Sequence, residues 1–110
     1  MEGFVKGDVV VLPFPFSDIS ANKRRPALVA TQGEYGDIIL CQITSKPKKS
    51  VETIELTDRD FQGGKLKITS YVRLRKIFTA DFGLILYRVG KIKKEKIKEV
   101  EDAICTIIKE

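Results

Sequence analysis

The 110-residue sequence contains no histidine and no tryptophan, and it has only two cysteines. Without histidine, the chain cannot build a Ser-His-Asp triad, a two-histidine nuclease site or a His-ligated zinc site. Two cysteines alone cannot supply the four ligands of a structural zinc ion. Any catalysis must therefore come from Arg, Lys, Asp, Glu, Tyr, Ser, Thr or Cys side chains.

Long apolar runs are also missing. No run approaches the roughly 20 residues that a membrane-spanning helix needs, and residues 1–6 contain no apolar signal core. We therefore expect a cytoplasmic protein without membrane contact. Cys41 and Cys105 both lie in short apolar runs, which favours two buried thiols in a reducing compartment. The sequence leaves a Cys41–Cys105 disulfide open.

What the chain does contain is typical of one small globular domain over residues 1–110. Hydrophobic residues make up 43% of it and charged residues 32%. Basic residues exceed acidic ones by 20 to 15, and the excess is spread along the chain. Local basic clusters occur at residues 23–25, 46–49, 73–76 and 91–98. Such clusters suit a phosphate backbone, although ordinary solvated side chains are the alternative.

The residue pattern predicts strands followed by a single helix. We expect a hairpin turn at residues 33–36, a long loop at 13–24, a helical turn capped by Thr57 or Asp58, and a break at Gly63-Gly64. The segment 27–30 is expected to be a central strand, buried on both faces. The expected strands are 8–12, 27–30, 37–44, 51–56, 70–77 and 84–89, and the amphipathic helix is 92–109. The prediction is a mainly β (α+β) fold, a small and partly open SH3-like barrel with a C-terminal amphipathic helix.

Five blocks of residues carry a resemblance to a known family. In order, they are Gly7–Val11, Arg25–Val29, Ile43–Ser45, Ser70–Arg73 and Lys76–Thr79. With their spacing, the chain resembles the MazF/PemK-type toxins of toxin–antitoxin systems over about residues 4–108. The resemblance implies an SH3-like barrel, a homodimer, and cleavage of single-stranded RNA without metal or cofactor. It also implies a cognate antitoxin protein whose extended acidic segment covers the site.

The same resemblance assigns roles to individual residues. The family's catalytic arginine, which precedes a proline, falls on Arg25, and its threonine at the end of the third strand falls on Thr44. The candidate RNA-binding residues are Phe16, Lys23, Arg24, Ser45, Lys46, Ser70 and Arg73. The block 76–79 departs from the family, because many relatives have a polar pair before the isoleucine and an arginine after it. This departure affects sequence preference and the dimer surface more than the core chemistry.

The proposed chemistry is also reasonable from the residue types. In RNA the 2′-hydroxyl can attack the adjacent phosphate, and an arginine fork matches the phosphate oxygens that gain charge. Pro26 favours an extended backbone at Arg25, which fixes the stem of that side chain. Thr44 can donate a hydroxyl hydrogen bond to the same phosphate. With no histidine present, the residues do not single out a general base.

Each candidate residue also has a structural interpretation. Arg25 could form an ion pair with Asp18 or Asp37, and Thr44 could simply favour a strand end. Arg73 and Arg75 could be surface residues of a strand, and Lys46 could be solvated. Phe14 and Phe16 could pack in the core or stack on bases.

Two other functions remain open at this stage. One is a non-catalytic inhibitor of the same fold, as in the CcdB-type gyrase poisons, which act through their terminal helix. The other is a nucleic-acid-binding SH3-like module that cuts nothing. The C-terminal residues 107–110 offer no motif for the first alternative.

Overall fold

A computed structural model describes residues 3–14 and 23–110 of the chain. The predicted site residue Phe16 and most of the predicted 13–24 loop lie outside these ranges. Along the chain, the described elements are β1 (Asp8–Pro13), β2 (Arg24–Gln32), β3 (Asp37–Thr44), β4 (Thr53–Leu56), the 3-10 turn η1 (Asp58–Asp60), β5 (Phe61–Gly64), β6 (Ser70–Asp81), the 3-10 turn η2 (Phe82–Leu84), β7 (Tyr87–Ile92) and α1 (Lys94–Ile108).

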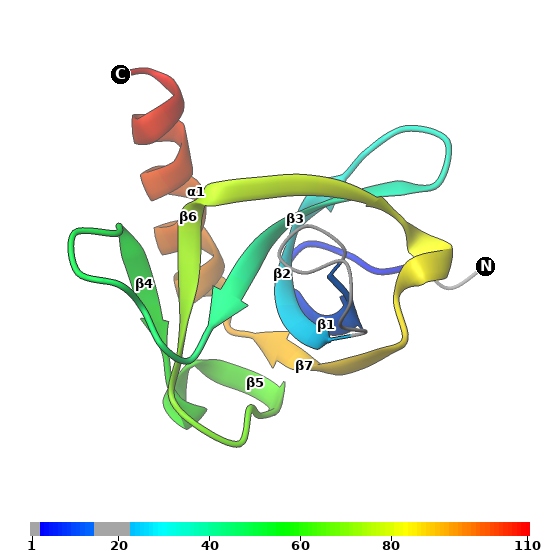
Figure 1. Ribbon diagram of the computed structural model, residues 1–110, viewed down its shortest axis with the longest axis horizontal. Coiled ribbons are helices and arrows are strands. Elements are labelled where there is room, and N and C mark those ends of the chain that lie inside the picture. Colours follow the sequence, from blue (N-terminus) through cyan, green and yellow to red (C-terminus); the bar gives the residue numbers. More distant parts are fainter. Residues whose placement is uncertain (1–2, 15–22) are drawn as a thin grey trace.

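The described strands form one curled, antiparallel, seven-stranded sheet in the order β4-β6-β3-β2-β1-β7-β5 (Figure 1). The long strand β6 lies inside the sheet, because Val72 pairs with Ile43 of β3 on one side and Ile54 of β4 on the other. The register along β3 then shifts, and the next pair is Cys41 with Ile77. The result is a partly open barrel with a C-terminal helix, which confirms the predicted fold class.

The core consists of two hydrophobic clusters on the two sides of the central strands. In β2, Ala27 and Val29 belong to one cluster and Leu28 to the other. In β1, Val10 and Val9 divide in the same way. Alternating side chains point to opposite faces of a strand, so β1 and β2 are covered on both faces. The predicted doubly buried central strand is therefore confirmed.

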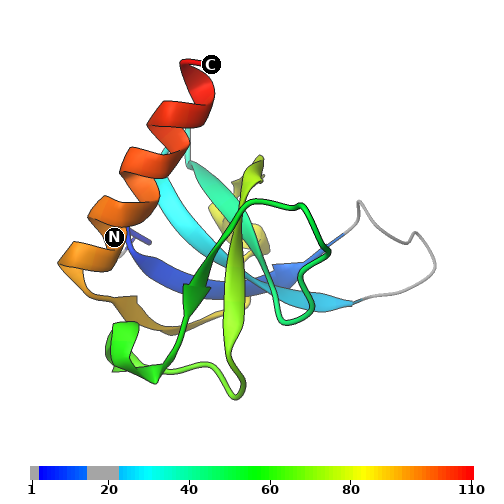
Figure 2. The same ribbon diagram turned by 90° about the vertical axis from the view of Figure 1, so that its left-hand side faces the viewer.

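Helix α1 covers one side of the curled sheet (Figure 2). Val100 is buried in the cluster that contains Leu28, and Ile97, Ile104 and Ile107 pack against that cluster. This is the apolar stripe that the helical spacing predicts. The helical spacing also places Ile108 on this stripe, but Ile108 is 70% exposed because it lies in the last turn, beyond the packed surface. None of the helices in the described part of the chain is long and apolar enough to cross a membrane.

The Gly7-Asp8 pair fixes the start of β1 through contacts with neighbouring strands and the N-terminal segment. Gly7 has a φ of +95°, and its N–H donates to the carbonyl of Val29 at 3.0 Å. Asp8 is 2% exposed, and its Oδ2 accepts hydrogen bonds from the Val5 N–H at 2.9 Å and from Arg88 Nη2 at 3.1 Å. A buried carboxylate needs such partners, so this pair has a structural role at the start of β1.

The predicted secondary structure needs correction at β5 and β7. The strands predicted at 27–30, 51–56 and 70–77 are present with other bounds, at Arg24–Gln32, Thr53–Leu56 and Ser70–Asp81. Gly63-Gly64 was interpreted as a break, but it belongs to β5. Gly90 was taken as the end of a strand, but it lies within β7. A Cβ atom on Gly64 would lie 2.1 Å from the carbonyl oxygen of Val89, so these glycines allow β5 and β7 to approach closely. The predicted strand 84–89 therefore starts later, at Tyr87 after η2, and ends at Ile92.

The helical turn at residues 58–60 is confirmed, with Thr57 as its N-cap and the Thr57 N–H donating to Asp60 Oδ2 at 2.8 Å. The two cysteines are free, so the disulfide does not form. Cys41 is buried, as predicted, but Cys105 is exposed. The prediction for Cys105 was wrong because its position on α1 lies beside the apolar stripe and faces away from the sheet.

We expect Gly7→Ala to destabilise the fold by roughly 1–3 kcal/mol. The added Cβ would lie 2.4 Å from Ile97 Cδ1, and the φ of +95° disfavours any L side chain. The free energy of unfolding in urea would measure the loss. Gly63→Ala is the matched control, because a Cβ there has no described atom within 4 Å. Equal stability of the two variants would contradict this account of Gly7.

The two thiols should differ strongly in reactivity. Burial raises the pKa of Cys41 from 9.0 to about 11, so its thiol stays protonated in the folded chain at pH 8. At that pH a maleimide should modify Cys105 quickly and Cys41 only after unfolding. Mass spectrometry of the peptides would show this, with Cys105→Ser as the control. Rapid labelling of Cys41 in the folded protein would contradict its placement in the core.

Candidate functional site

A cleft with a volume of about 760 Å³ opens where β2 begins and β3 ends. It brings together most of the site residues predicted from the sequence. These are Lys23, Arg24, Arg25, Thr44, Ser45, Lys46 and Ser70. The other described lining residues are Val11, Pro26, Ile43, Lys65, Leu66, Lys67, Ile68, Tyr87 and Val89.

Strand register explains why residues so distant in sequence meet. Ala27 of β2 pairs with Gln42 of β3, and continuing this antiparallel register by two residues brings Arg25 opposite Thr44. Directly opposite residues have Cβ atoms roughly 5 Å apart. Thr44 in turn pairs with Tyr71 of β6, which places Ser70 at the same edge. The pairing of β2, β3 and β6 therefore assembles the cleft.

The cleft has a strongly positive lining. Six cationic side chains line it, and no acidic side chain does so among the described residues. These cations are Lys23, Arg24, Arg25, Lys46, Lys65 and Lys67. Concave surfaces with charges of one sign concentrate the electrostatic field and attract ions of the opposite sign. The cleft is therefore suited to a polyanion.

Arg25 keeps hydrogen-bonding capacity for such a ligand. It is half-buried, and its Nε is buried without a hydrogen-bond partner. No ion pair involves Arg25 in residues 3–14 and 23–110. The proposed pairing with Asp37 is wrong because Asp37 starts β3 and the cleft lies at its other end, while Asp18 lies outside the described residues. An unpaired buried donor costs free energy, which an anionic ligand would recover.

The hydroxyl groups of the site differ in what they can still do. Thr44 Oγ1 accepts a hydrogen bond from the Lys46 N–H at 3.1 Å, so its own hydrogen can be donated to a ligand. Ser70 is buried, and its Oγ donates to the carbonyl of Ile68 at 2.9 Å. Ser70 therefore holds the segment 65–69 against the start of β6, whereas Ser45 is exposed in the cleft.

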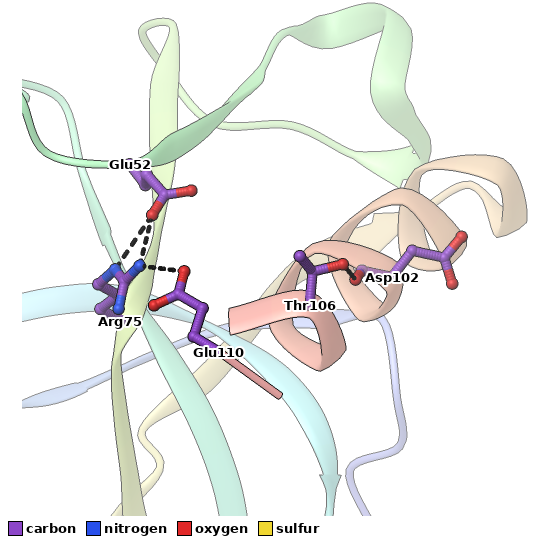
Figure 3. A network of polar contacts seen from close by, with 5 residues as sticks. All are labelled: Glu52, Arg75, Asp102, Thr106 and Glu110. Carbon is purple, nitrogen blue, oxygen red and sulfur yellow. Dashed lines mark hydrogen bonds and ion pairs between the residues drawn. The ribbon is translucent and has the colours of Figure 1, made fainter. Parts of the chain in front are cut away.

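Arg73 and Arg75 do not line this cleft. Arg73 pairs with Thr53 of β4, farther along β6. Arg75 Nη2 lies 2.8 Å from Glu52 Oε1 and 2.7 Å from Glu110 Oε2 (Figure 3). These two carboxylates raise the pKa of Arg75, first through their hydrogen bonds to the guanidinium. Its interpretation as a surface strand residue is therefore confirmed, and it ties the C-terminus to the sheet.

Of the two aromatic candidates, Phe14 lies within the described residues. Phe14 is buried and makes an edge-on contact with Phe78, with ring centroids 4.9 Å apart. Of the two roles considered for Phe14, packing in the core is confirmed. In the described residues, no group of three or more His, Cys, Asp or Glu side chains could hold a metal ion.

Sequence reasoning missed Lys65, Lys67, Ile68 and Tyr87. The first three lie between β5 and β6, in a segment to which sequence reasoning assigned no function because it follows the break expected at Gly63-Gly64. A local signal was present, because Lys65 and Lys67 alternate with Leu66 and Ile68. Tyr87 had no such signal, since it reaches the cleft only through the pairing of β7 with β1.

The fold and the cleft define a small curled β-barrel protein with a cationic groove at the edge of its central strands. The chain belongs to the family of PemK-like, MazF-like toxins of type II toxin–antitoxin systems, whose family model matches residues 5–108. No curated protein sequence gives a significant match.

Solved structures share the fold at low sequence identity. MazF (Form-I) from Deinococcus radiodurans is 20% identical, with all of both chains covered and a TM-score of 0.76. MazE-MazF (Form-II) from the same organism is 19% identical, with 98% of this chain and 97% of that chain covered and a TM-score of 0.74. An endoribonuclease in complex with its cognate antitoxin from a mycobacterial species is 14% identical, with coverages of 96% and 95% and a TM-score of 0.75.

We expect Lys67→Gln to weaken the binding of a single-stranded polyanion and to lower its salt dependence. Loss of one phosphate contact should reduce the slope of log K against log salt by about 0.7. Fluorescence anisotropy with a non-cleavable 2′-O-methyl RNA at several salt concentrations would measure both quantities. Lys94→Gln, on the exposed face of α1, is the control. Identical slopes for the two variants would argue against Lys67 as a contact.

Proposed function

We propose that the protein is a sequence-preferring endoribonuclease toxin that cleaves single-stranded RNA without metal and without the ribosome. The observation that carries the proposal is the common cleft of Arg25 and Thr44, which is lined by cations and by no described acidic side chain. Membership of the MazF-like toxin family supports the same activity. The cytoplasm, where RNA is made and translated, is the expected location.

In the proposed reaction, the 2′-oxygen of the RNA attacks the adjacent phosphorus, and the bond from phosphorus to the 5′-oxygen breaks. The 2′-hydroxyl loses its proton, the 5′-oxygen gains one, and the products are a 2′,3′-cyclic phosphate and a 5′-hydroxyl. The phosphoryl oxygens gain charge on the way, so donors placed around them accelerate the reaction. The protein therefore needs to hold the attack in line and to stabilise that charge.

Arg25 is suited to stabilising this charge. Its guanidinium carries a planar set of donors that matches phosphate oxygens, and its buried Nε has no described partner to release first. Thr44 can donate its hydroxyl hydrogen to the same phosphate, since its oxygen is oriented by the Lys46 N–H. An arginine is a poor base because its guanidinium keeps its proton under all ordinary conditions. Positioning and charge stabilisation therefore carry the catalysis.

The surrounding cations hold the rest of the strand. Lys23, Arg24 and Lys46 are exposed at the edge of the cleft, where they can contact neighbouring phosphates. Ser45 offers a hydroxyl beside them. The same cleft would attract the extended acidic segment of a cognate antitoxin, which would then exclude RNA by occupying its binding site. We further propose that the toxin acts as a homodimer, as the family resemblance implies.

Arg25→Ala should reduce RNA cleavage by a hundredfold or more, because one donor to a developing anion contributes about 10²–10³ in rate. Arg25→Lys, which keeps the charge but loses the planar fork, should recover only a small part. The assay incubates the pure protein with a mixed-sequence RNA in EDTA and maps the cut sites and their termini. Arg59→Ala, an exposed arginine outside the cleft, is the control.

Two results would overturn the proposal. One is undiminished cleavage by Arg25→Ala, which would move the active site elsewhere. The other is wild-type cleavage that requires a divalent metal. Binding of RNA with no cleavage by the wild type would instead identify a nucleic-acid-binding module.

A further inference from the structure

Tyr87 is a large aromatic side chain on the wall of the cationic cleft. It is 53% exposed, and Ile68, which lines the same cleft, is 62% exposed. An aromatic face beside a row of cations is the combination by which proteins bind single-stranded nucleic acid, because the cations follow the backbone and the ring stacks on a base.

Accepting the proposed function, we infer that Tyr87 is a base-stacking residue that holds the nucleobase next to the phosphate bound by Arg25. Ile68 supplies a further apolar contact for the same base. The substrate must then be single-stranded at this position, because a paired base stays stacked within its duplex.

The strand register connects Tyr87 to Pro26, and Arg25, the preceding residue of β2, lines the same cleft. Val11 of β1 pairs with Pro26 of β2 on one side and with Tyr87 of β7 on the other. Directly paired residues place their side chains on the same face of a sheet, and all three line the cleft. Two strand spacings, roughly 10 Å, separate Tyr87 from Pro26, the neighbour of Arg25. This separation is comparable with the reach of a nucleotide from its phosphate to its base.

The sheet leaves this part of β7 uncovered. The described pairing of β5 with β7 begins at Phe61 with Ile92 and ends at Gly64 with Gly90. Tyr87 lies three residues before Gly90, beyond the end of β5, as Figure 1 shows for the two strands. The tyrosine therefore has a free face toward the cleft, and its exposure follows from the shortness of β5.

The composition of the cleft favours RNA over a protein as the occupant of this face. Pro26, Ile43 and Val11 give the cleft an apolar part of its lining in addition to Tyr87, and six cationic side chains line the same cleft. A nucleotide presents both an apolar base and an anionic phosphate, so it satisfies both parts at once.

The lack of tryptophan provides a direct test. Tyr87→Trp would place the only tryptophan of the chain on the cleft wall. Titration with a single-stranded 2′-O-methyl RNA, which cannot be cleaved, should change its fluorescence strongly through base stacking, and a duplex of the same sequence should not. Tyr35→Trp, at a 99% exposed position in the β2–β3 hairpin, is the matched control and should not respond.

Kinetics give a second measurement. Tyr87→Ala should raise KM for RNA cleavage about 5- to 160-fold, the scale of one stacking contact, while kcat changes much less. Tyr87→Phe should keep the wild-type KM, because stacking needs the ring and not the hydroxyl. A substrate with an abasic nucleotide beside the cut site should lose affinity with the wild-type protein, and Tyr87→Ala should then add no further loss. The abasic substrate tests stacking even if Tyr87→Ala folds poorly.

The outcomes separate the two proposals. Absence of cleavage by the wild type would defeat the proposed function, whatever the fluorescence of the Tyr87→Trp variant shows. Cleavage that depends on Arg25, with an unchanged KM in Tyr87→Ala and no fluorescence response in Tyr87→Trp, would overturn the stacking role alone. A Tyr87→Ala variant that binds RNA normally but loses binding to an acidic antitoxin peptide would also overturn it.

Discussion

The antiparallel register of β1, β2 and β3 is the constraint on which the site depends. Because Ala27 pairs with Gln42, Arg25 comes close to Thr44. Because Val11 pairs with both Pro26 and Tyr87, these three side chains lie side by side across β2, β1 and β7. A shift of one residue would turn every side chain of a strand to the other face. Because Ala27 and Val29 pack in one cluster and Leu28 in the other, such a shift would exchange their faces and disrupt the packing of both clusters. Core packing thus fixes the geometry of residues that are themselves outside the core.

The cleft concentrates like charges that do not stabilise the fold. Its cations repel one another, whereas the acidic partners of the protein lie elsewhere. Asp8 holds Arg88, and Glu52 and Glu110 hold Arg75. Arginines that serve the fold are therefore paired, and Arg25, which serves the proposed chemistry, has no described ion-pair partner. Either of the two proposed partners, an RNA strand or an acidic antitoxin segment, would relieve the repulsion, and both would then compete for the cleft.

Much of the fold could be predicted because local sequence patterns determine it. The bounds of β3, the hairpin before it and the apolar stripe of α1 follow from periodicity and turn residues. β5 could not be predicted, since Gly63-Gly64 looks like a break until Gly90 of β7 is seen packed against it. In the site, Tyr87 was missed for the same reason, because only the pairing of β7 with β1 brings it to the cleft. Lys65 and Lys67 were missed although they alternate with apolar residues. Arg73 was included because its local pattern resembles a site residue, yet its pairing with Thr53 takes it away from the cleft.

The absence of histidine determines how the proposed mechanism can accelerate the reaction. An enzyme without a base near neutral pH must gain its rate from charge stabilisation and alignment, and both require a rigid donor. Arg25 has such rigidity, since its backbone enters the β1–β2 pairing opposite Leu12 and Pro26 restricts it to an extended form. Its buried, unpaired Nε stores a free-energy cost that binding of a phosphate would relieve. The folded protein would thus hold the Arg25 guanidinium in position before the substrate binds. No further free energy would then be needed to orient this donor toward the phosphoryl oxygens that gain charge.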